Sequence, residues 1–298
     1  MTHSTHIPLI VEIPKNEQEK FDELIKQYRT QYIRSSQEIV DLSFSENPKY
    51  LKGLKTKSVS QTIAELREIA WQEYLNDEVN FNAKLMRDLH KKLETPKEII
   101  DSLLTQHAME KQGSELASTI KEICGEYAGR VFPYIYRLSL SNTQSRRSRA
   151  GKTFEAIIYR IYQGLDYEFD SQSKVGRKIF DSLGLGKKVD SILPNIEAFK
   201  KRRNKTIIGT MKTTLRERWQ EVAEEIERTK IPEIHLLTAD EDISKSKAIE
   251  MANHNIIIVT YDWVANSDSL KAMKNIISFE EYLFEEIPNI LKFWSDDK

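Results

Sequence analysis

The hydrophobic pattern of this chain changes near residue 140, close to the middle of its 298 residues. Before that point, apolar side chains such as Ile63, Leu66 and Ile69 recur at the three- to four-residue spacing of a helix with one buried face. Beyond it, short apolar runs that resemble strands alternate with helical segments. The strand-like runs cover residues 166–170, 187–194, 205–212, 235–239 and 255–260.

The order of these segments predicts the fold class. One helix followed by three strands, and then by alternating helices and strands, is typical of a mixed sheet with helices packed against it. We therefore predict an α+β fold, with an α/β/α mixed-sheet domain over residues 139–298. Residues 1–138 are predicted to form a helical N-terminal domain, because Gly and Pro are sparse there and the helical spacing continues through it.

Composition excludes several classes of protein. The single Cys124 rules out an internal disulfide framework, and the six His residues are too scattered for a zinc site. No run approaches the roughly 20 apolar residues of a membrane span. The apolar run near the N-terminus is short and lacks a basic segment before it, unlike a signal peptide. We expect a cytoplasmic protein that does not bind membranes.

The net charge of −1 is an average over two unlike parts. Residues 141–230 contain 20 Lys and Arg and 12 Asp and Glu. The whole chain has 45 basic and 46 acidic residues, so the rest of it contains 25 Lys and Arg and 34 Asp and Glu. Such separation favours a basic working surface on a nearly neutral protein, as nucleic-acid binding requires. An ordinary solvated surface can show the same pattern, so charge alone leaves both interpretations open.

Asp190 and Lys212 occupy positions where ionisable side chains are unusual. Asp190 lies between Val189 and Ile192 in a strand-like run, and Lys212 ends the next run 22 residues later. An acid and a Lys on neighbouring strands are the minimal pair for phosphodiester hydrolysis, because carboxylates hold a divalent metal and a cation stabilises the charge on the phosphate. The alternative is a buried ion pair with no further role.

A second acid must reach the same metal, but position 210, two residues before Lys212, is Thr. The helix that follows can supply this acid. At about 100° per residue, the apolar side chains of residues 215–226 form one buried stripe, and Glu225 lies about 80° from its middle. A carboxylate at that border can lean toward Lys212, or it can be an ordinary solvated Glu.

Three segments together resemble a known family. In order and spacing, SRRSRAGKTFE, KKVDSILPN and MKTTLRERWQEVAEEIERTKIPEIHLLT resemble the EcoRII-type C-terminal domain, which is grouped with the CCGG-family restriction endonucleases. The resemblance covers roughly residues 140–262. It implies the restriction-endonuclease fold called PD-(D/E)XK, with a permuted active site in which the second acid comes from the helix.

The resemblance also implies roles for individual residues. Asp190 and Lys212 match the family's Asp and Lys, and Glu225, 13 residues after Lys212, matches the displaced acid. Glu155, 35 residues before Asp190, matches a further Glu near the metal. Asp190, Glu225 and Glu155 are thereby expected to hold Mg²⁺. Val189 departs from the Pro of the motif's name, which is common in this fold, and Thr at position 210 is expected of the permuted site.

DNA recognition is predicted from the start of the same helix. Arg can bond the O6 and N7 of guanine, and Glu can accept from the N4 of cytosine, so Arg216, Glu217 and Arg218 are suited to reading C·G pairs. They resemble the family's Arg-(Asp/Glu)-Arg element, although a solvated helix start would look the same. Gln144 matches a family Gln that reaches the minor groove. The basic residues expected to hold phosphates are Arg146, Arg147, Arg149 and Lys152.

The sequence thus predicts a type II restriction endonuclease of the bacterial cytoplasm that makes Mg²⁺-dependent double-strand breaks in DNA. Cutting both strands of a palindrome implies at least a homodimer, and relatives also form tetramers. A cognate DNA methyltransferase would be its functional partner in the cell. The competing interpretations are a repair or junction-resolving nuclease of the same fold and a non-catalytic sequence-specific DNA-binding protein.

The target is predicted to contain CC and GG halves, either contiguous as CCGG or separated as CCNGG. The second arrangement calls for an aromatic residue to stack on an extruded central base. Trp71 is the candidate, but a core position is favoured for it. We therefore favour CCGG with one flanking pair on each side.

Overall fold

The computed structural model describes residues 10–54, 58–107, 113–185, 189–215, 218–229 and 231–296. Contacts within the chain divide it into two compact units. The sheet unit comprises Ser36–Trp71 and Arg149–Lys298, and the helical unit comprises Met1–Ser35 and Gln72–Ser148. Two long helices contribute to both units, α4 (Val59–Lys92) and α7 (Phe132–Gly164).

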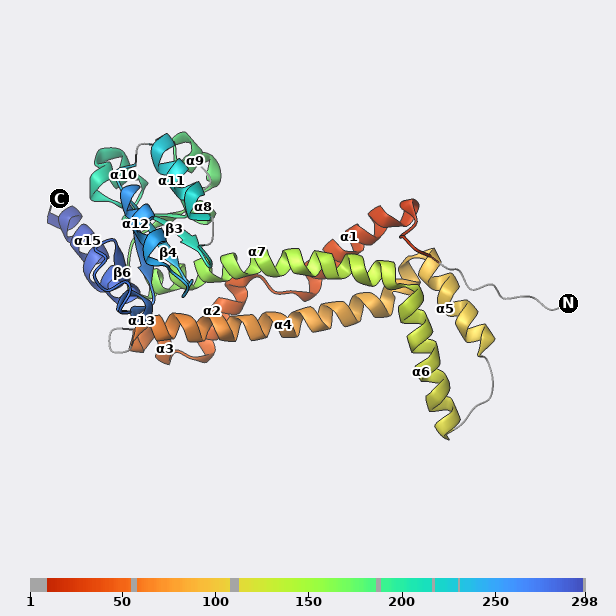
Figure 1. The fold of residues 1–298 in the computed structure, drawn as a ribbon. Coiled ribbons are helices and arrows are strands. Elements are labelled where there is room, and N and C mark those ends of the chain that lie inside the picture. Colours follow the sequence, from red (N-terminus) through yellow and green to blue (C-terminus); the bar gives the residue numbers. More distant parts are fainter. Residues whose placement is uncertain are drawn as a thin grey trace. The chain divides into compact units, whose positions relative to one another are not determined.

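A six-stranded mixed sheet forms the centre of the sheet unit, with the strands in the order β1-β2-β3-β4-β5-β6 (Figure 1). β1, β2 and β3 are antiparallel, and β3 to β6 run parallel to one another. The parallel strands β4 and β5 are apolar and almost wholly buried, as expected where helices cover both faces of a sheet. The strands are β1 (Asp170–Ser171), β2 (Ser191–Leu193), β3 (Ile207–Lys212), β4 (Ile234–Thr238), β5 (Ile256–Thr260) and β6 (Ile276–Ser278).

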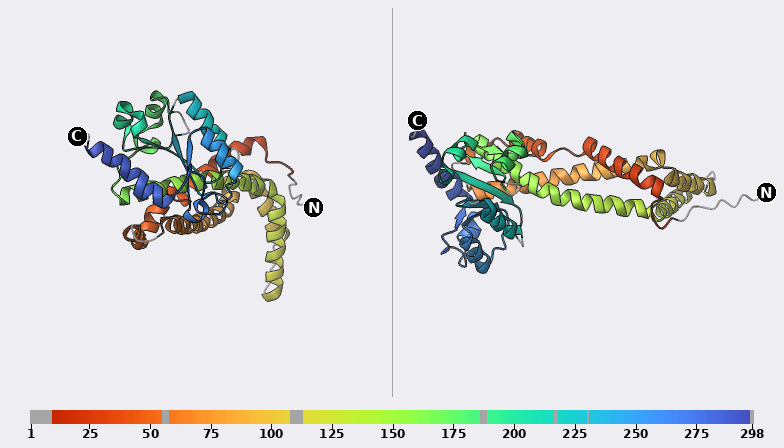
Figure 2. Two further views of the ribbon diagram at one scale, coloured as in Figure 1. Left: turned by 60° about the vertical axis from the view of Figure 1, so that its left-hand side comes forward. Right: turned by 90° about the horizontal axis from the view of Figure 1, so that it is seen from above.

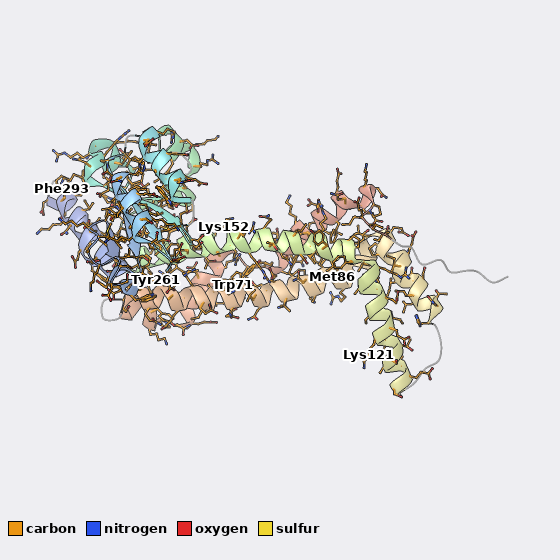
Figure 3. The ribbon with its side chains drawn as sticks, in the orientation of Figure 1. Trp71, Met86, Lys121, Lys152, Tyr261 and Phe293 are labelled. Atoms are coloured by element: carbon orange, nitrogen blue, oxygen red, sulfur yellow. The ribbon has the colours of Figure 1, made fainter. Side chains whose placement is uncertain are left out.

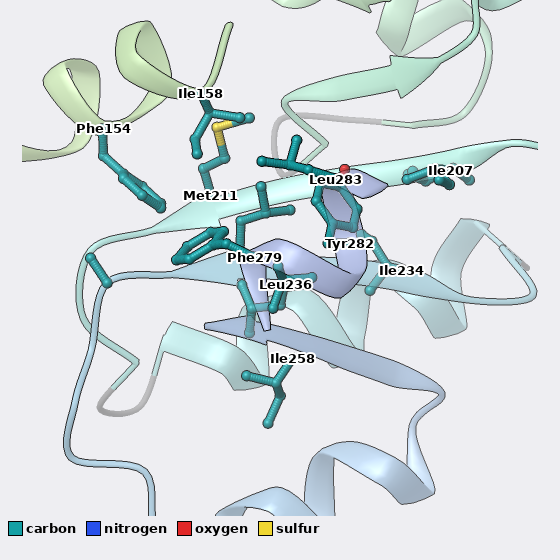
Figure 4. Close-up of a cluster of buried hydrophobic side chains, with 14 of the residues drawn as sticks. Phe154, Ile158, Ile207, Met211, Ile234, Leu236, Ile258, Phe279, Tyr282 and Leu283 are labelled. Atoms are coloured by element: carbon teal, nitrogen blue, oxygen red, sulfur yellow. The ribbon is translucent and has the colours of Figure 1, made fainter. Parts of the chain in front are cut away.

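Helices and the sheet share one hydrophobic core in this unit. Figure 4 shows Phe154 and Ile158 of α7 gathered with Met211 of β3 and with Phe279 and Tyr282. The remaining elements of the unit are α2 (Ser36–Glu46), α3 (Lys49–Gly53), α8 (Gln172–Val175), α9 (Arg177–Ser182), α10 (Ile196–Lys201), the 3₁₀ turn η1 (Arg203–Lys205), α11 (Arg218–Thr229), α12 (Lys245–Asn253), α13 (Asp262–Ala265), α14 (Phe279–Glu281), the π-helical turn η2 (Tyr282–Glu286) and α15 (Ile287–Asp296).

The helical unit packs α1 (Lys15–Tyr32) and α5 (Glu94–Gln106) with the second part of α4 and the first part of α7. Phe21, Phe81 and Tyr134 lie in its separate core, and the rings of Phe21 and Tyr134 meet edge to face. The remaining helix of this unit, α6 (Gly113–Arg130), projects from the others (Figure 2). Thr119 is its one buried side chain.

The predicted α+β class with a mixed sheet is confirmed. The buried stripe predicted over residues 215–226 also lies as expected: Val222 and Ile226 of α11 are in the core, as is Leu215, which precedes the helix. β6 was not predicted, because three residues are too few to show a period. The predicted domain boundary between residues 138 and 139 stays a prediction. The sheet unit includes Ser36–Trp71 from the first half of the chain, but a division by contacts does not test which parts fold independently. None of the described helices is long and apolar enough to cross a membrane.

Candidate active site

Asp190 stands immediately before β2 rather than within it. Its backbone N–H donates to the carbonyl oxygen of Gly209 on β3, 2.8 Å away, so the ladder between the two strands already includes it. Its carboxylate oxygen Oδ2 accepts from the backbone N–H of Met211 at 2.6 Å and from the hydroxyl of Thr210 at 3.3 Å. The carboxylate is therefore anchored on β3, next to the strand's last residue.

Lys212 is that last residue, and its Nζ lies 3.8 Å from Asp190 Oδ2. The ammonium also donates to the carbonyl oxygen of Met211 at 3.1 Å and to the hydroxyl of Thr210 at 3.3 Å. Thr210 and Lys212 point to the same face of the sheet because side chains alternate along a strand. The fully buried Thr210 hydroxyl thus contacts both charged groups, at the position where this fold commonly has an acid.

Glu155 approaches the pair from α7. The pKa of Glu155 is raised to about 7, mainly by burial and then by the Asp190 carboxylate, while Lys212 and Lys152 act in the opposite direction. One turn later on the same helix, the Tyr159 hydroxyl donates to the carbonyl oxygen of Asp190 at 2.9 Å. The fold therefore brings together two carboxylates and a Lys from a stretch of sequence in which Glu155 and Lys212 are 57 positions apart.

This donor set fits a divalent cation. A bound cation offsets the repulsion by which the Asp190 carboxylate raises the pKa of Glu155, and oxygen ligands suit Mg²⁺. Among the described residues, no group of three acidic, His or Cys side chains is close enough to hold a metal. The side chain of Glu225, the predicted third ligand on α11, lies outside the described residues.

The predicted DNA contacts divide between the two units. Gln144 and Arg147 are exposed on the part of α7 in the helical unit, and Lys152 is exposed on the same helix in the sheet unit (Figure 3). Arg149 is partly buried. Arg216 and Glu217 lie outside the described residues, as does the side chain of Arg218, the first residue of α11.

Arg146 has a partner that sequence reasoning missed. Its guanidinium forms an ion pair with the carboxylate of Glu78, donating from Nε at 2.9 Å, and the Glu78 side chain is only 3% exposed. The hydroxyl of Tyr74 donates to the same carboxylate at 2.9 Å. The two residues of the ion pair are 68 positions apart, and no local pattern signals such a contact. Its role in holding phosphate stays a prediction, and the ion pair gives Arg146 a structural role as well.

Trp71 does not lie in the core as favoured from the sequence. It is a partly exposed residue of α4, outside the buried cluster of the sheet unit (Figure 3).

Sequence reasoning also missed Asp240, which follows β4. A signal for it was available, since the C-terminal ends of parallel strands gather at one edge of a sheet, where functional groups are common.

The model of the family described as "EcoRII C terminal" matches residues 118–283, more than half of the chain. The chain belongs to this family. The type II restriction enzyme SsoII of Shigella sonnei is 33% identical to it over 225 residues, which are 75% of this chain and 67% of that enzyme. The family and this relative make the chain a restriction endonuclease, a site-specific DNA nuclease.

Solved structures of such enzymes with DNA are similar to the whole fold. Metal-depleted Ecl18kI in complex with uncleaved, modified DNA matches with a TM-score of 0.70 and 26% identity, covering 93% of this chain and 85% of that one. The complex of PspGI with substrate DNA matches with a TM-score of 0.54 and 20% identity, covering 96% of this chain and 99% of that one, and supports the fold alone. Type II restriction enzymes in general use a divalent metal.

Proposed function

We propose that this enzyme cuts both strands of a palindromic DNA site with CC and GG halves, using Mg²⁺ at the cluster of Glu155, Asp190 and Lys212. One observation carries the proposal: Asp190 and Lys212 meet at the edge of the sheet, beside a Glu whose pKa is raised by burial and by Asp190. An ion pair of Asp190 with Lys212 would not need the Glu155 carboxylate. A second buried carboxylate beside Asp190 costs free energy unless a bound metal ion offsets the repulsion between the two.

Each residue has a proposed role. Asp190, Glu155 and Glu225 would hold the metal, which when bound polarises the phosphate and lowers the pKa of a water. Lys212, held by Thr210 and by the carbonyl oxygen of Met211, would stabilise the charge on the phosphate and orient the attacking water. Its exposed fraction of 13% keeps the ammonium in a weakly screened environment, where its charge acts more strongly.

Recognition would be divided between bases and backbone. Arg216, Glu217 and Arg218 would read C·G pairs in the major groove, and Gln144 would reach the minor groove. Arg147, Arg149 and Lys152 would hold phosphates, which orient the protein without reading sequence. We assign Arg146 to the same cluster, with its ion pair to Glu78 holding this part of α7.

The spacing of the two halves is the finer part of the proposal. Both CCGG and CCNGG are compatible with one Arg-Glu-Arg element in each subunit. The preference for CCGG depended on the lack of an identified stacking residue, and the partial exposure of Trp71 weakens it because a core position had been favoured for that side chain. Fluorescence of 2-aminopurine at the centre of a CCNGG duplex distinguishes the two. A large rise on binding, together with cleavage, would establish the interrupted site, and cleavage of CCGG alone would establish the contiguous one.

A homodimer is proposed because cutting both strands of a palindrome calls for two catalytic clusters related by a two-fold axis. An apolar stripe in the helical unit supports it. Phe132, Tyr136 and Leu140, one turn apart on α7, are 58%, 56% and 50% exposed, whereas Tyr134 and Leu138 on the opposite side of the helix are buried. Assembly into tetramers and a cognate methyltransferase in the cell belong to the same proposal.

Plasmid digestion with Mg²⁺ tests the function directly. Discrete bands whose sequenced ends share one palindrome with CC and GG halves would support the proposal. A smear, or cutting at branched DNA alone, would favour the repair or junction-resolving nuclease. Specific binding without cleavage under any divalent metal would favour the non-catalytic DNA-binding protein, the third interpretation.

A further inference from the structure

We propose that Asp240 is a positioning residue that fixes the start of α11 relative to Lys212, so that base reading and cleavage depend on one carboxylate in the loop after β4. The proposal rests on the function proposed above. It concerns the connection between Lys212, the last residue of β3, and Arg218, the first residue of α11. The proposed base-reading residues stand at the end of this connection.

The hydrogen bonds of Asp240 point to this role. Its Oδ2 accepts from the backbone N–H of Leu215 at 2.7 Å, and its Oδ1 accepts from the backbone N–H of Asp242 at 3.1 Å. Its own backbone N–H donates to the hydroxyl of the fully buried Thr238, 3.1 Å away. Both carboxylate oxygens are therefore occupied, and the residue that carries them is anchored to β4.

These contacts close a ring around the connection. Thr238 is the register partner of Lys212 in the parallel pairing of β3 with β4. The ring runs from Lys212 across the sheet to Thr238, through Asp240 to Leu215, and back along the chain to Lys212. Leu215 is fully buried at the end of this path. Without Asp240, this ring opens, and the backbone N–H of Leu215 loses the acceptor that ties it to the loop after β4.

Loss of the Asp240 contacts is expected to affect discrimination between correct and incorrect base pairs more than the stability of the fold. Contacts to base edges need side chains held within a few tenths of an ångström, and a displacement of about 1 Å can cost roughly 100-fold in rate. α11 also carries Glu225, the proposed displaced acid. A loosened start of this helix therefore weakens the reading of the correct pair, and discrimination against a wrong pair falls with it.

The loop provides a matched control. Asp242 is exposed and takes part in the contact through its backbone N–H, which survives substitution of its side chain. Asp242→Ala therefore removes one negative charge from the same loop and leaves the ring closed. Asp240→Ala opens the ring, and Asp240→Asn keeps one acceptor oxygen and restores it in part.

The experiment compares the full-length variants on two duplexes, one with the site mapped from the wild-type digest and one with a single C·G pair of that site changed to T·A. The ratio of the two cleavage rates measures discrimination. We expect Asp240→Ala to lower it at least about tenfold, Asp240→Asn to lower it less, and Asp242→Ala to keep it within about twofold. Hydrogen exchange at residues 213–217 is expected to rise in Asp240→Ala and to stay unchanged in Asp242→Ala.

Two results would overturn the positioning role. The first is an unchanged ratio in a folded Asp240→Ala variant, and the second is an equal loss in Asp242→Ala, which would assign the effect to loop charge. Failure of the proposed function itself gives a different result, because the wild-type enzyme would then show no preference for the mapped duplex. If Asp240→Ala does not fold, the Asp240→Asn and Asp242→Ala pair gives the same comparison.

Discussion

Thr210→Val tests the geometry of the catalytic cluster by replacing a single hydroxyl group. The substitution replaces a fully buried hydroxyl by a methyl group of similar size and leaves the backbone of β3 in place. It removes the donor to Asp190 and the acceptor for Lys212, both at 3.3 Å, whereas the bond from the backbone N–H of Met211 to Asp190 at 2.6 Å remains. We therefore expect the substitution to change the orientation of the Asp190 and Lys212 side chains relative to each other.

The magnitude follows from these distances. A hydrogen bond to a charged group typically contributes about 1.5–3 kcal/mol. Both bonds of Thr210 are long, so we take roughly 0.5–1 kcal/mol for each. A total of about 1–2 kcal/mol corresponds to cleavage slowed about 5- to 30-fold. Thr210→Ser keeps the hydroxyl and is expected to cut within about threefold of the wild-type rate, because only the methyl group is lost.

The assay is single-turnover cleavage with enzyme in excess, alongside the Kd for the same duplex measured without metal. A slower rate with an unchanged Kd would support the assignment, because the described side-chain contacts of Thr210 are with Asp190 and Lys212. Thermal unfolding of each variant separates loss of fold from loss of rate. The reasoning is refuted if Thr210→Val cuts at the wild-type rate, or if the Val and Ser variants are slowed equally.

Four further outcomes are expected. Asp190→Ala should abolish cleavage while gel shifts still show sequence-specific binding; near wild-type cutting would remove this residue from the active site. Arg216→Ala should cost roughly 1–3 kcal/mol of discrimination at a C·G pair, and equal weakening on cognate and random DNA would argue against base reading. Arg147→Ala should weaken binding to every sequence and flatten its salt dependence, whereas Arg146→Ala should also lower the Tm by roughly 5 °C because the buried Glu78 carboxylate loses its ion-pair partner and keeps the Tyr74 hydroxyl; equal Tm values would contradict the structural role of that ion pair. Burial lowers the pKa of His235 from 6.5 to about 4, so the unfolded chain takes up a proton first as the pH falls. The contribution of His235 should therefore lower the free energy of unfolding between pH 6.5 and pH 4, by about 2 kcal/mol at pH 5, whereas the raised pKa of Glu155 acts in the opposite direction. The difference between the wild type and His235→Leu in urea titrations at pH 8 and pH 5 isolates the His235 contribution; the same pH dependence in both proteins would contradict it.

Local pattern was sufficient for much of the fold. The apolar runs that became β3, β4 and β5 could be predicted because period and length are properties of consecutive residues. Asp190 and Lys212 could be paired because Asp190 directly precedes β2, Lys212 ends β3, and strands that follow one another in the sequence usually lie side by side. The buried stripe of α11 followed from 100° per residue alone.

Other features could not be derived from local pattern. The resemblance suggested Glu155, but its raised pKa depends on burial and on the nearby Asp190 carboxylate, which packing alone creates. The pairing of Arg146 with Glu78 joins residues 68 positions apart, so a side chain that looked available for phosphate is held by a buried carboxylate.

The sequence by itself determined the period of the longer segments, the order of β3, α11, β4, α12 and β5, and the chemical groups present at the edge of the sheet. Tertiary structure decided which of those groups meet. Asp240 is an unremarkable acid until the parallel pairing of β3 with β4 brings it within 2.7 Å of the backbone of Leu215, 25 residues earlier. The physical reason is that periodicity depends on neighbours along the chain, whereas hydrogen bonds and pKa values depend on neighbours in space, which are set by how the side chains pack.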